Sequence, residues 1–205
     1  MKMNFSPLNP ISIRISGEAG QGNILMGIIL SKALIEEGYW VVQTQHYGAQ
    51  VRGGLSYCDV LFNNEPIDYP ESKNFNILYL MHNLGIPHIS TLKRNGILFY
   101  DGKFVDNIPS YIERITKKII RVPASEVAAE ELLNMNVANM VGLGVLCAVT
   151  QIVPLETLLK IVKENVSKNY VEIDEKAVKK GYTLIEKKYL LKLNERTQKL
   201  GKGYE

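Results

Sequence analysis

The chain has 205 residues, of which 46% are hydrophobic and 22% charged, the composition and length of a globular protein with one sizeable α/β domain. Its 24 Lys and Arg against 21 Asp and Glu give a formal net charge of +3, which is too small for a general nucleic-acid-binding surface. The basic excess lies in residues 160–205, which hold 12 basic and 7 acidic side chains. We therefore expect a single domain, 1–205, with a core at 11–160 and a basic helical C-terminal extension at 161–205.

The first predicted unit is a strand, a glycine-rich turn and a helix. Isoleucines alternate with polar residues over 11–15, the period of a strand, and the pattern stops at Gly17. Apolar residues then recur every three or four positions over 22–37, and Gly38 ends this helix. A second strand begins at 39–42. A right-handed crossover would place the two strands in one parallel sheet, a Rossmann-like start.

Further along the chain, short apolar runs alternate with turns and then give way to helices. The predicted elements are strands at 55–62, 75–81, 97–100 and 118–122, a short helix at 86–92, and helices at 137–152, 155–166 and 177–191, with Ser125 as an N-cap. The expected fold class is α/β, a single three-layer domain with a mostly parallel sheet and a helical C-terminal part.

Two stretches bear on location. The longest apolar run, 137–154, is interrupted by polar residues, whereas a membrane span needs about 20 clean apolar residues. We expect a buried helix there and no membrane association. Residues 1–10 contain one Lys and no apolar run, so no secretory or transit peptide is expected. The protein is therefore predicted to be cytoplasmic.

The turn Gly17-Glu18-Ala19-Gly20-Gln21-Gly22 lies between the first strand and the first helix, where glycine lets the backbone approach an anion. A dinucleotide fingerprint needs a glycine in place of alanine and an acidic end to the second strand, and both are missing. A Walker loop needs Lys and Ser or Thr, where Asn23 and Ile24 stand. Two interpretations stay open: a binding turn for a phosphate, a carboxylate or a neighbouring protein's backbone, or a tight turn that only packs helix against sheet. The candidate residues are Gly17, Gly20, Gln21 and Gly22.

A second polar stretch, 43–54, follows the second strand, at the sheet edge where open α/β proteins bind ligands. We expect it to face the glycine turn. Arg52, beside two glycines, either presents its guanidinium to a carboxylate or phosphate or pairs with a surface Glu. The candidates in this stretch are Gln45, Tyr47, Arg52, Gly53 and Gly54.

No catalytic residue and no metal ligand is predicted. His46 has no Asp, Ser or Cys near it in the sequence to complete a nucleophilic site. Cys58 and Cys147 stand 89 residues apart with no CxxC spacing, so they cannot supply four cluster ligands and are expected to be small buried hydrophobes. The lysine pairs of the last helix are expected on its solvent face.

Taken together and in this order, the two loops resemble those of the gamma subunits of 2-oxoacid:ferredoxin oxidoreductases, which handle 2-oxoglutarate, pyruvate or branched-chain oxoacids. That family typically has Gly-x-Gly-Gly-Gln-Gly after its first strand, which 17–22 match except at the third position, and Tyr-Gly-x-x-x-Arg-Gly-Gly, which 47–54 match. Residues 65–70 and 139–144 resemble two further motifs of the family. The resemblance spans roughly 11–160.

The resemblance implies an accessory subunit of a coenzyme A-dependent enzyme that oxidatively decarboxylates a 2-oxoacid and passes electrons to ferredoxin. In such complexes alpha and beta subunits handle thiamine diphosphate and the oxoacid, and delta or beta subunits hold the iron–sulfur clusters, so this chain alone would bind no cofactor. Its turn and Arg52 would position an anion or dock the catalytic subunits.

Two alternative functions remain, the small subunit of indolepyruvate ferredoxin oxidoreductase and a free-standing anion- or nucleotide-binding module. Because a surface made for other subunits leaves apolar area exposed, the isolated chain is also expected to form a homodimer.

Overall fold

The computed structural model describes residues 10–48, 53–189 and 191. Within them, six strands form one sheet in the order β2-β3-β1-β4-β5-β6. The strands are β1 (Ile11–Glu18), β2 (Trp40–Tyr47), β3 (Leu55–Asn63), β4 (Phe75–Leu80), β5 (Leu92–Asp101) and β6 (Ile119–Val122). The helices are α1 (Asn23–Glu36), α2 (Ile112–Ile115), α3 (Ala124–Glu130), α4 (Ala138–Thr150), α5 (Leu155–Asn165) and α6 (Val171–Leu184), with 3-10 helices η1 (Asn83–Thr91) and η2 (Met135–Val137).

The sheet is mostly parallel, with one exception. β1, β4, β5 and β6 pair in parallel, whereas β3 runs antiparallel to both of its neighbours, β1 and β2. β2 therefore shares the direction of β1, as predicted, but is not paired with it. The connection from β2 turns straight back into β3, and a close return of this kind produces an antiparallel pair.

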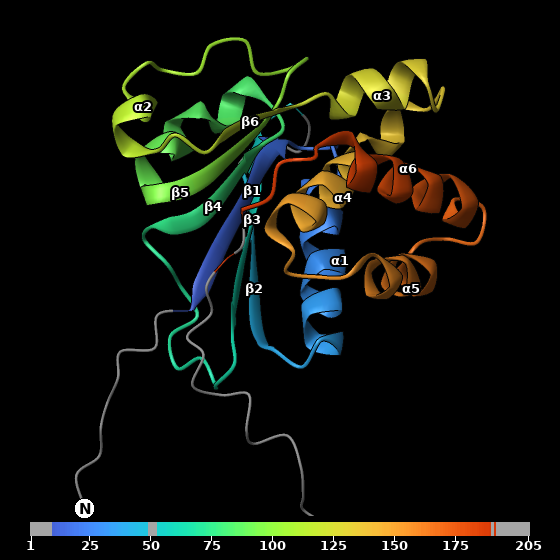
Figure 1. Ribbon diagram of the computed structural model, residues 1–205, viewed down its shortest axis with the longest axis horizontal. Helices are drawn as coiled ribbons and strands as arrows, with labels where there is room; N and C mark the ends of the chain where they lie inside the picture. Colours follow the sequence, from blue (N-terminus) through green and yellow to red (C-terminus); the bar gives the residue numbers. More distant parts are fainter. Residues whose placement is uncertain (1–9, 49–52, 190, 192–205) are drawn as a thin grey trace, which may run out of the picture.

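Helices cover both sides of the sheet and complete the predicted three layers (Figure 1). α1, α4, α5 and α6 lie on one side, where alternate strand residues such as Ile13, Ile15 and Val60 are fully buried. Every residue of α4 from Asn139 to Thr150 is buried, which confirms the buried helix predicted there. Among the described residues, no helix is long and apolar enough to cross a membrane.

The other side of the sheet is covered unevenly. η1 packs against β1 and β4, and α2 packs against β5. Leu78, Leu98 and Ile112 belong to a second, smaller core on this side. Over β1 and β3, this side instead carries polar residues, among them Arg14 and Asp59, which are also buried or nearly so. The polar part of this side is therefore formed by β1, which leads into the glycine turn, and by β3.

The helical part differs from the sequence prediction at three points. The last helix is α6, Val171–Leu184, which starts earlier and ends earlier than the predicted 177–191. Its first turn contains two acidic residues, which favour a helix N-terminus. Ser125 is not an N-cap: it lies inside α3, and its hydroxyl donates to Asp101 Oδ2 at 2.8 Å. The predicted helix at 86–92 is the 3-10 helix η1.

Candidate functional site

The glycine turn joins β1 to α1 through two residues of left-handed backbone. Gly20 has φ +109° and Gly22, the N-cap of α1, has φ +78°, angles that side-chain-bearing residues rarely adopt. A Cβ at Gly20 would meet no atom within 4 Å, whereas one at Gly22 would lie 2.4 Å from Asn139 Nδ2. Gly20 thus leaves open space above the turn, and Gly22 permits a close approach to α4.

The side chain of Gln21 makes two hydrogen bonds to the backbone near the turn. Its Oε1 accepts a hydrogen bond from the Glu18 backbone N–H at 2.9 Å, and its Nε2 donates to the Met81 carbonyl at 3.3 Å. A Cβ at Gly17 would approach Gln21 Oε1 to 2.7 Å, so glycine there makes room for this side chain. Gln21 therefore ties the turn to the end of β4, and its amide is already engaged on both atoms.

The second loop returns to the glycine turn. The Ala19 N–H donates to the Gly54 carbonyl at 2.8 Å, and Gly53, with φ +76°, lies next to the Glu18 side chain. The expectation that the two loops face each other is confirmed by this contact. Arg52 lies outside the described residues, so its predicted role stays a prediction.

Gln45 and Tyr47 lie in β2, the edge strand of the sheet next to β3. The Tyr47 hydroxyl donates to Gln45 Oε1 at 2.9 Å, and Tyr47 is 66% exposed. Strand register places Tyr47 opposite Ser56, and Ser56 opposite Gly17. Tyr47 is therefore in the same row as Gly17, the first residue of the turn, with β3 between them, whereas Gln45 is opposite Cys58 and Ile15, two residues before that row. Gln45 and Tyr47 are both exposed.

A cleft of ≈190 Å³ opens beside the turn, at the carboxyl ends of β1, β4 and β5. The chain leaves β1 toward one side of the sheet through α1 and leaves β4 toward the other through η1, and ligands of open α/β sheets bind where connections diverge in this way. The cleft is lined by Glu18, Gly20, Gln21, Met81, Asp101, Phe104, Ser125, Met135, Asn136 and Ala138.

Asp101 is an acidic residue of this cleft that the sequence analysis did not single out. Its Oδ1 accepts the Lys103 N–H at 2.9 Å, and its Oδ2 accepts the Ser125 N–H and hydroxyl at 3.0 and 2.8 Å. These bonds join the end of β5 to the first turn of α3. The carboxylate thus shapes the wall of the cleft.

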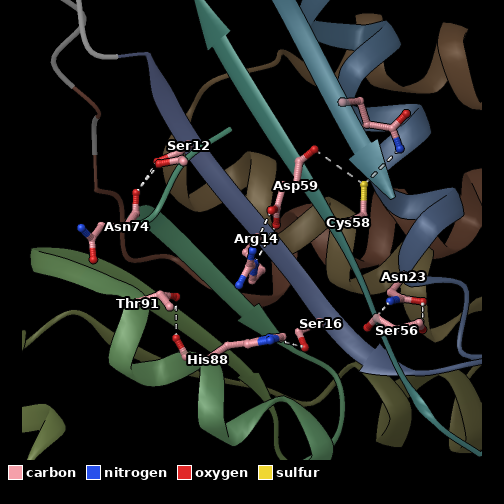
Figure 2. A network of polar contacts seen from close by, with 12 residues as sticks. Ser12, Arg14, Ser16, Asn23, Ser56, Cys58, Asp59, Asn74, His88 and Thr91 are labelled. Atoms are coloured by element: carbon pink, nitrogen blue, oxygen red, sulfur yellow. Dashed lines mark hydrogen bonds and ion pairs between the residues drawn. The ribbon is translucent and has the colours of Figure 1, made fainter. Parts of the chain in front are cut away.

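On the side of β1 and β3 away from α1, the polar contacts drawn in Figure 2 join Arg14 to Asp59 and Ser16 to His88. The Asn23 to Ser56 contact in the same view lies at the start of α1. Arg14 makes two hydrogen bonds of 2.7 Å to Asp59, and its guanidinium lies between the rings of Tyr57 and Phe75, 4.3 and 4.2 Å from their centres. Sequence analysis missed this pair, because the partners are 45 residues apart and only strand pairing brings them together.

His88 joins this network through Ser16, with its Nδ1 3.0 Å from the Ser16 hydroxyl oxygen. Burial, and then the positive charge of Arg14 and the neighbouring His46, lower the pKa of His88 to about 4, so the ring is neutral at pH 7. Ser16 is fully buried, so its hydroxyl is inaccessible to a substrate, whereas His88 is half-buried. His46 itself stacks on Tyr57, with ring centres 4.4 Å apart.

Both cysteines are buried and behave as apolar residues. Burial raises the pKa of Cys58 to about 11, even though Gln43 donates a hydrogen bond to its sulfur, and burial raises that of Cys147 further. Thiols with raised pKa values are poor nucleophiles and poor metal ligands. Within the described ranges, no three His, Cys, Asp or Glu side chains gather as a metal site would require.

A sequence model described as pyruvate ferredoxin/flavodoxin oxidoreductase matches residues 12–184, which is most of the chain. The match includes every described strand, except for the first residue of β1. The chain belongs to the pyruvate ferredoxin/flavodoxin oxidoreductase family. This match extends through α6, beyond the part of the chain that carries the sequence motifs.

Two relatives from one organism align over most of their length. The chain is 36% identical over 177 residues to the 2-oxoglutarate synthase subunit KorC of Methanothermobacter marburgensis, which covers 84% of this chain and 95% of that one. It is 29% identical over 160 residues to the pyruvate synthase subunit PorC of the same organism, covering 75% and 85%.

Among solved structures, the gamma subunit of a keto/oxoacid ferredoxin oxidoreductase from Geobacter sulfurreducens has a TM-score of 0.74 and 30% identity to this chain, covering 84% of this chain and 94% of that one. The predicted resemblance is thereby confirmed: the chain is a gamma-type subunit of a 2-oxoacid:ferredoxin oxidoreductase.

Proposed function

We propose that this gamma subunit serves a complex that acts on 2-oxoglutarate, and that its glycine turn holds an anionic group of coenzyme A. The substrate is suggested by the 2-oxoglutarate synthase subunits, which align over nearly their whole length. The observation that carries the turn's role is Gly20, whose left-handed backbone leaves open space beside the N-terminus of α1. That terminus has no side-chain cap and no acidic residue in its first turn, and a helix N-terminus of this kind attracts an anion.

The remaining chemistry is assigned to partner subunits. Thiamine diphosphate would supply decarboxylation and iron–sulfur clusters would carry the electrons to ferredoxin. Among the described residues no three His, Cys, Asp or Glu side chains gather to hold a metal ion, and both cysteines are buried. We assign these cofactors to alpha, beta and delta subunits. The chain's own residues would bind and orient the anion and shape the crevice around it. We also propose that the complex is cytoplasmic.

The surface proposed to meet a catalytic subunit is β2. This strand lies at the edge of the sheet, and its sequence, Trp-Val-Val-Gln-Thr-Gln-His-Tyr, contains no Lys or Pro, the residues that usually protect an edge strand from pairing. Trp40 at its start is 56% exposed and Tyr47 at its end 66%. In the isolated chain, a second copy would cover the same edge.

A pair of matched variants tests the role of the turn. Gly20→Asp places a negative charge in the open space, and Gly20→Asn places a neutral side chain of the same shape there. Both residue types tolerate left-handed backbone better than others do. In the reconstituted complex, we expect Gly20→Asp to raise the KM for coenzyme A at least about tenfold above that of Gly20→Asn, a difference of roughly 1.4 kcal/mol. Equal KM values in the two variants would refute anion binding at the turn.

A further inference from the structure

A second pocket shares a lining residue of η2 with the cleft at the turn. Its volume is ≈250 Å³, and it lies between α1, η2, the start of α4, the end of α5 and the first turn of α6. Asn136 lines both cavities. We call it the Asp174 pocket; it is lined by Leu25, Asn136, Val137, Asn139, Met140, Asn165, Val166, Ser167, Tyr170 and Asp174.

Asp174 is the charged residue of this pocket, and its carboxylate has no partner in the described part of the chain. The residue is only 7% exposed, and within the described part of the chain its carboxylate has neither a hydrogen-bond donor nor an ion-pair partner. Its backbone N–H donates to the Tyr170 carbonyl at 2.9 Å, so the main chain of the helix is satisfied while the side chain is not. A buried carboxylate without a partner is unfavourable, and proteins normally pair such a group.

The surroundings of the carboxylate define the ligand that would pair with it. α1, η2, α4 and α5 contribute only uncharged side chains to the lining, and the connection before α6 adds Ser167 and Tyr170. Lys32 reaches the rim, where its ammonium donates to Asn165 Oδ1. The amide oxygens of Asn139 and Asn165 already accept hydrogen bonds from the Met140 N–H and Lys32. Beside the one negative charge, the acceptors that remain in the lining are the Asn136 amide oxygen and the hydroxyls of Ser167 and Tyr170, a set that suits several N–H groups on a single cation.

We propose that the Asp174 pocket binds an ammonium or guanidinium group, which pairs with Asp174 and donates its remaining hydrogens to the Asn136 amide oxygen and to the hydroxyls of Ser167 and Tyr170. A divalent metal is disfavoured, because the described residues place no three acidic, His or Cys side chains together there. Asn139 connects the pocket to the glycine turn, because it lines the pocket and its Nδ2 donates a hydrogen bond to the Gly22 carbonyl at 3.2 Å. The proposal is independent of coenzyme A binding.

The pH dependence of binding follows from the carboxylate. Burial raises the pKa of Asp174 to about 6, and on its own helix Glu172 and Glu175 pair instead with Lys176 and Lys179. A cation should therefore bind above pH 6, where Asp174 is charged, and should be released as the pH falls below it.

Agmatine, which carries both an ammonium and a guanidinium group, is the probe. We would titrate the isolated full-length chain by NMR at pH 7.5 and pH 5, comparing the wild type with Asp174→Asn and with Glu172→Gln, which removes a solvent-exposed carboxylate from the same helical turn. The expected result is saturable binding at pH 7.5 by the wild type and Glu172→Gln, at least about tenfold weaker at pH 5 and in Asp174→Asn. Equal affinity of the wild type and Asp174→Asn, or no binding by the wild type, would overturn the proposal.

A second measurement separates a ligand site from a structural role. If Asp174 has no partner in the free protein, Asp174→Asn should keep or raise the melting temperature at pH 7.5. A marked fall would mean that the carboxylate already stabilises the fold, and would refute the proposal. If Asp174→Asn keeps its stability but no longer binds agmatine, its affinity for partner subunits shows where the cation comes from. Weakened assembly indicates a Lys or Arg of a partner subunit, and unchanged assembly indicates a small molecule.

Discussion

At the scale of single residues, the two glycines of the turn have different tasks. A Cβ at Gly20 enters open space, so Gly20→Ala meets only backbone strain of about 1–2 kcal/mol. A Cβ at Gly22 also collides with the Asn139 amide, and Gly22→Ala should cost about 2–4 kcal/mol in total. Urea unfolding measures both variants. Equal losses would show that α4 yields at this contact and that the close approach is not needed.

His88 and Asp174 should give stability opposite dependences on pH. The pKa of His88 is lowered to about 4, so between that value and about 6.5 the unfolded chain takes up a proton that the folded chain does not. Acidification through this window therefore reduces the free energy of unfolding. The pKa of Asp174 is raised to about 6, so the folded chain is the first to take up a proton there, and acidification below pH 6 stabilises.

Two variants separate these contributions. Relative to the wild type, His88→Gln should gain stability as the pH falls from about 6.5 to 4, and Asp174→Asn should lose it over about 6 to 4. Denaturant unfolding at a series of pH values gives the differences directly. Because the two sites share no described contact, the double variant should show the sum of the two changes. A His88→Gln difference that does not vary with pH would contradict the lowered pKa.

At the scale of elements, the open edge of β2 should govern self-association. Gln45→Lys adds a charge to this strand, which disfavours pairing with another strand. Sedimentation of the isolated chain is expected to show at least about tenfold weaker self-association for this variant. Ile35→Lys is the matched control, because Ile35 is also exposed, at 57%, but lies on α1. Equal effects of the two lysines would place the interface elsewhere.

Helices and strands were predictable where the spacing of apolar residues or a single proline is enough to identify them. Alternating isoleucines indicated β1, and the spacing of apolar residues together with Pro154 indicated α5. The direction of β3 was not predictable, because a period of two residues marks a strand without saying which neighbour it pairs with. The start of α6 was placed too late, because its first turn is rich in charged residues and carries a weaker apolar pattern.

The candidate site was predictable in position and less so in detail. Both loops were identified from their glycines and their place after strands, and the Ala19 to Gly54 hydrogen bond joins them. The task of Gln21 was hidden, since its acceptor at Met81 is 60 residues away. Asp174 was hidden for the same reason: its pocket is made by five separate elements.

At the scale of the whole molecule, the subunit should depend on its partners for all redox chemistry. We expect the purified chain to be colourless and free of iron, because its two cysteines are buried, one in β3 and one in α4, and cannot supply four cluster ligands. The visible absorption spectrum and an iron assay after anaerobic purification check this. A stoichiometric cluster in the isolated chain would contradict the division of labour proposed for the complex.

The contact between Gly22 and Asn139 also dictates when the turn can take shape during synthesis. Its two residues are separated by 117 positions, so the beginning of α1 leaves the ribosome long before the residue that fixes it. Contacts this distant form late, because the intervening chain must first be ordered. A nascent chain that stops before α4 would lack the Asn139 contact that completes the turn, so we expect the subunit to become competent to meet its partners only after α4 has been synthesised.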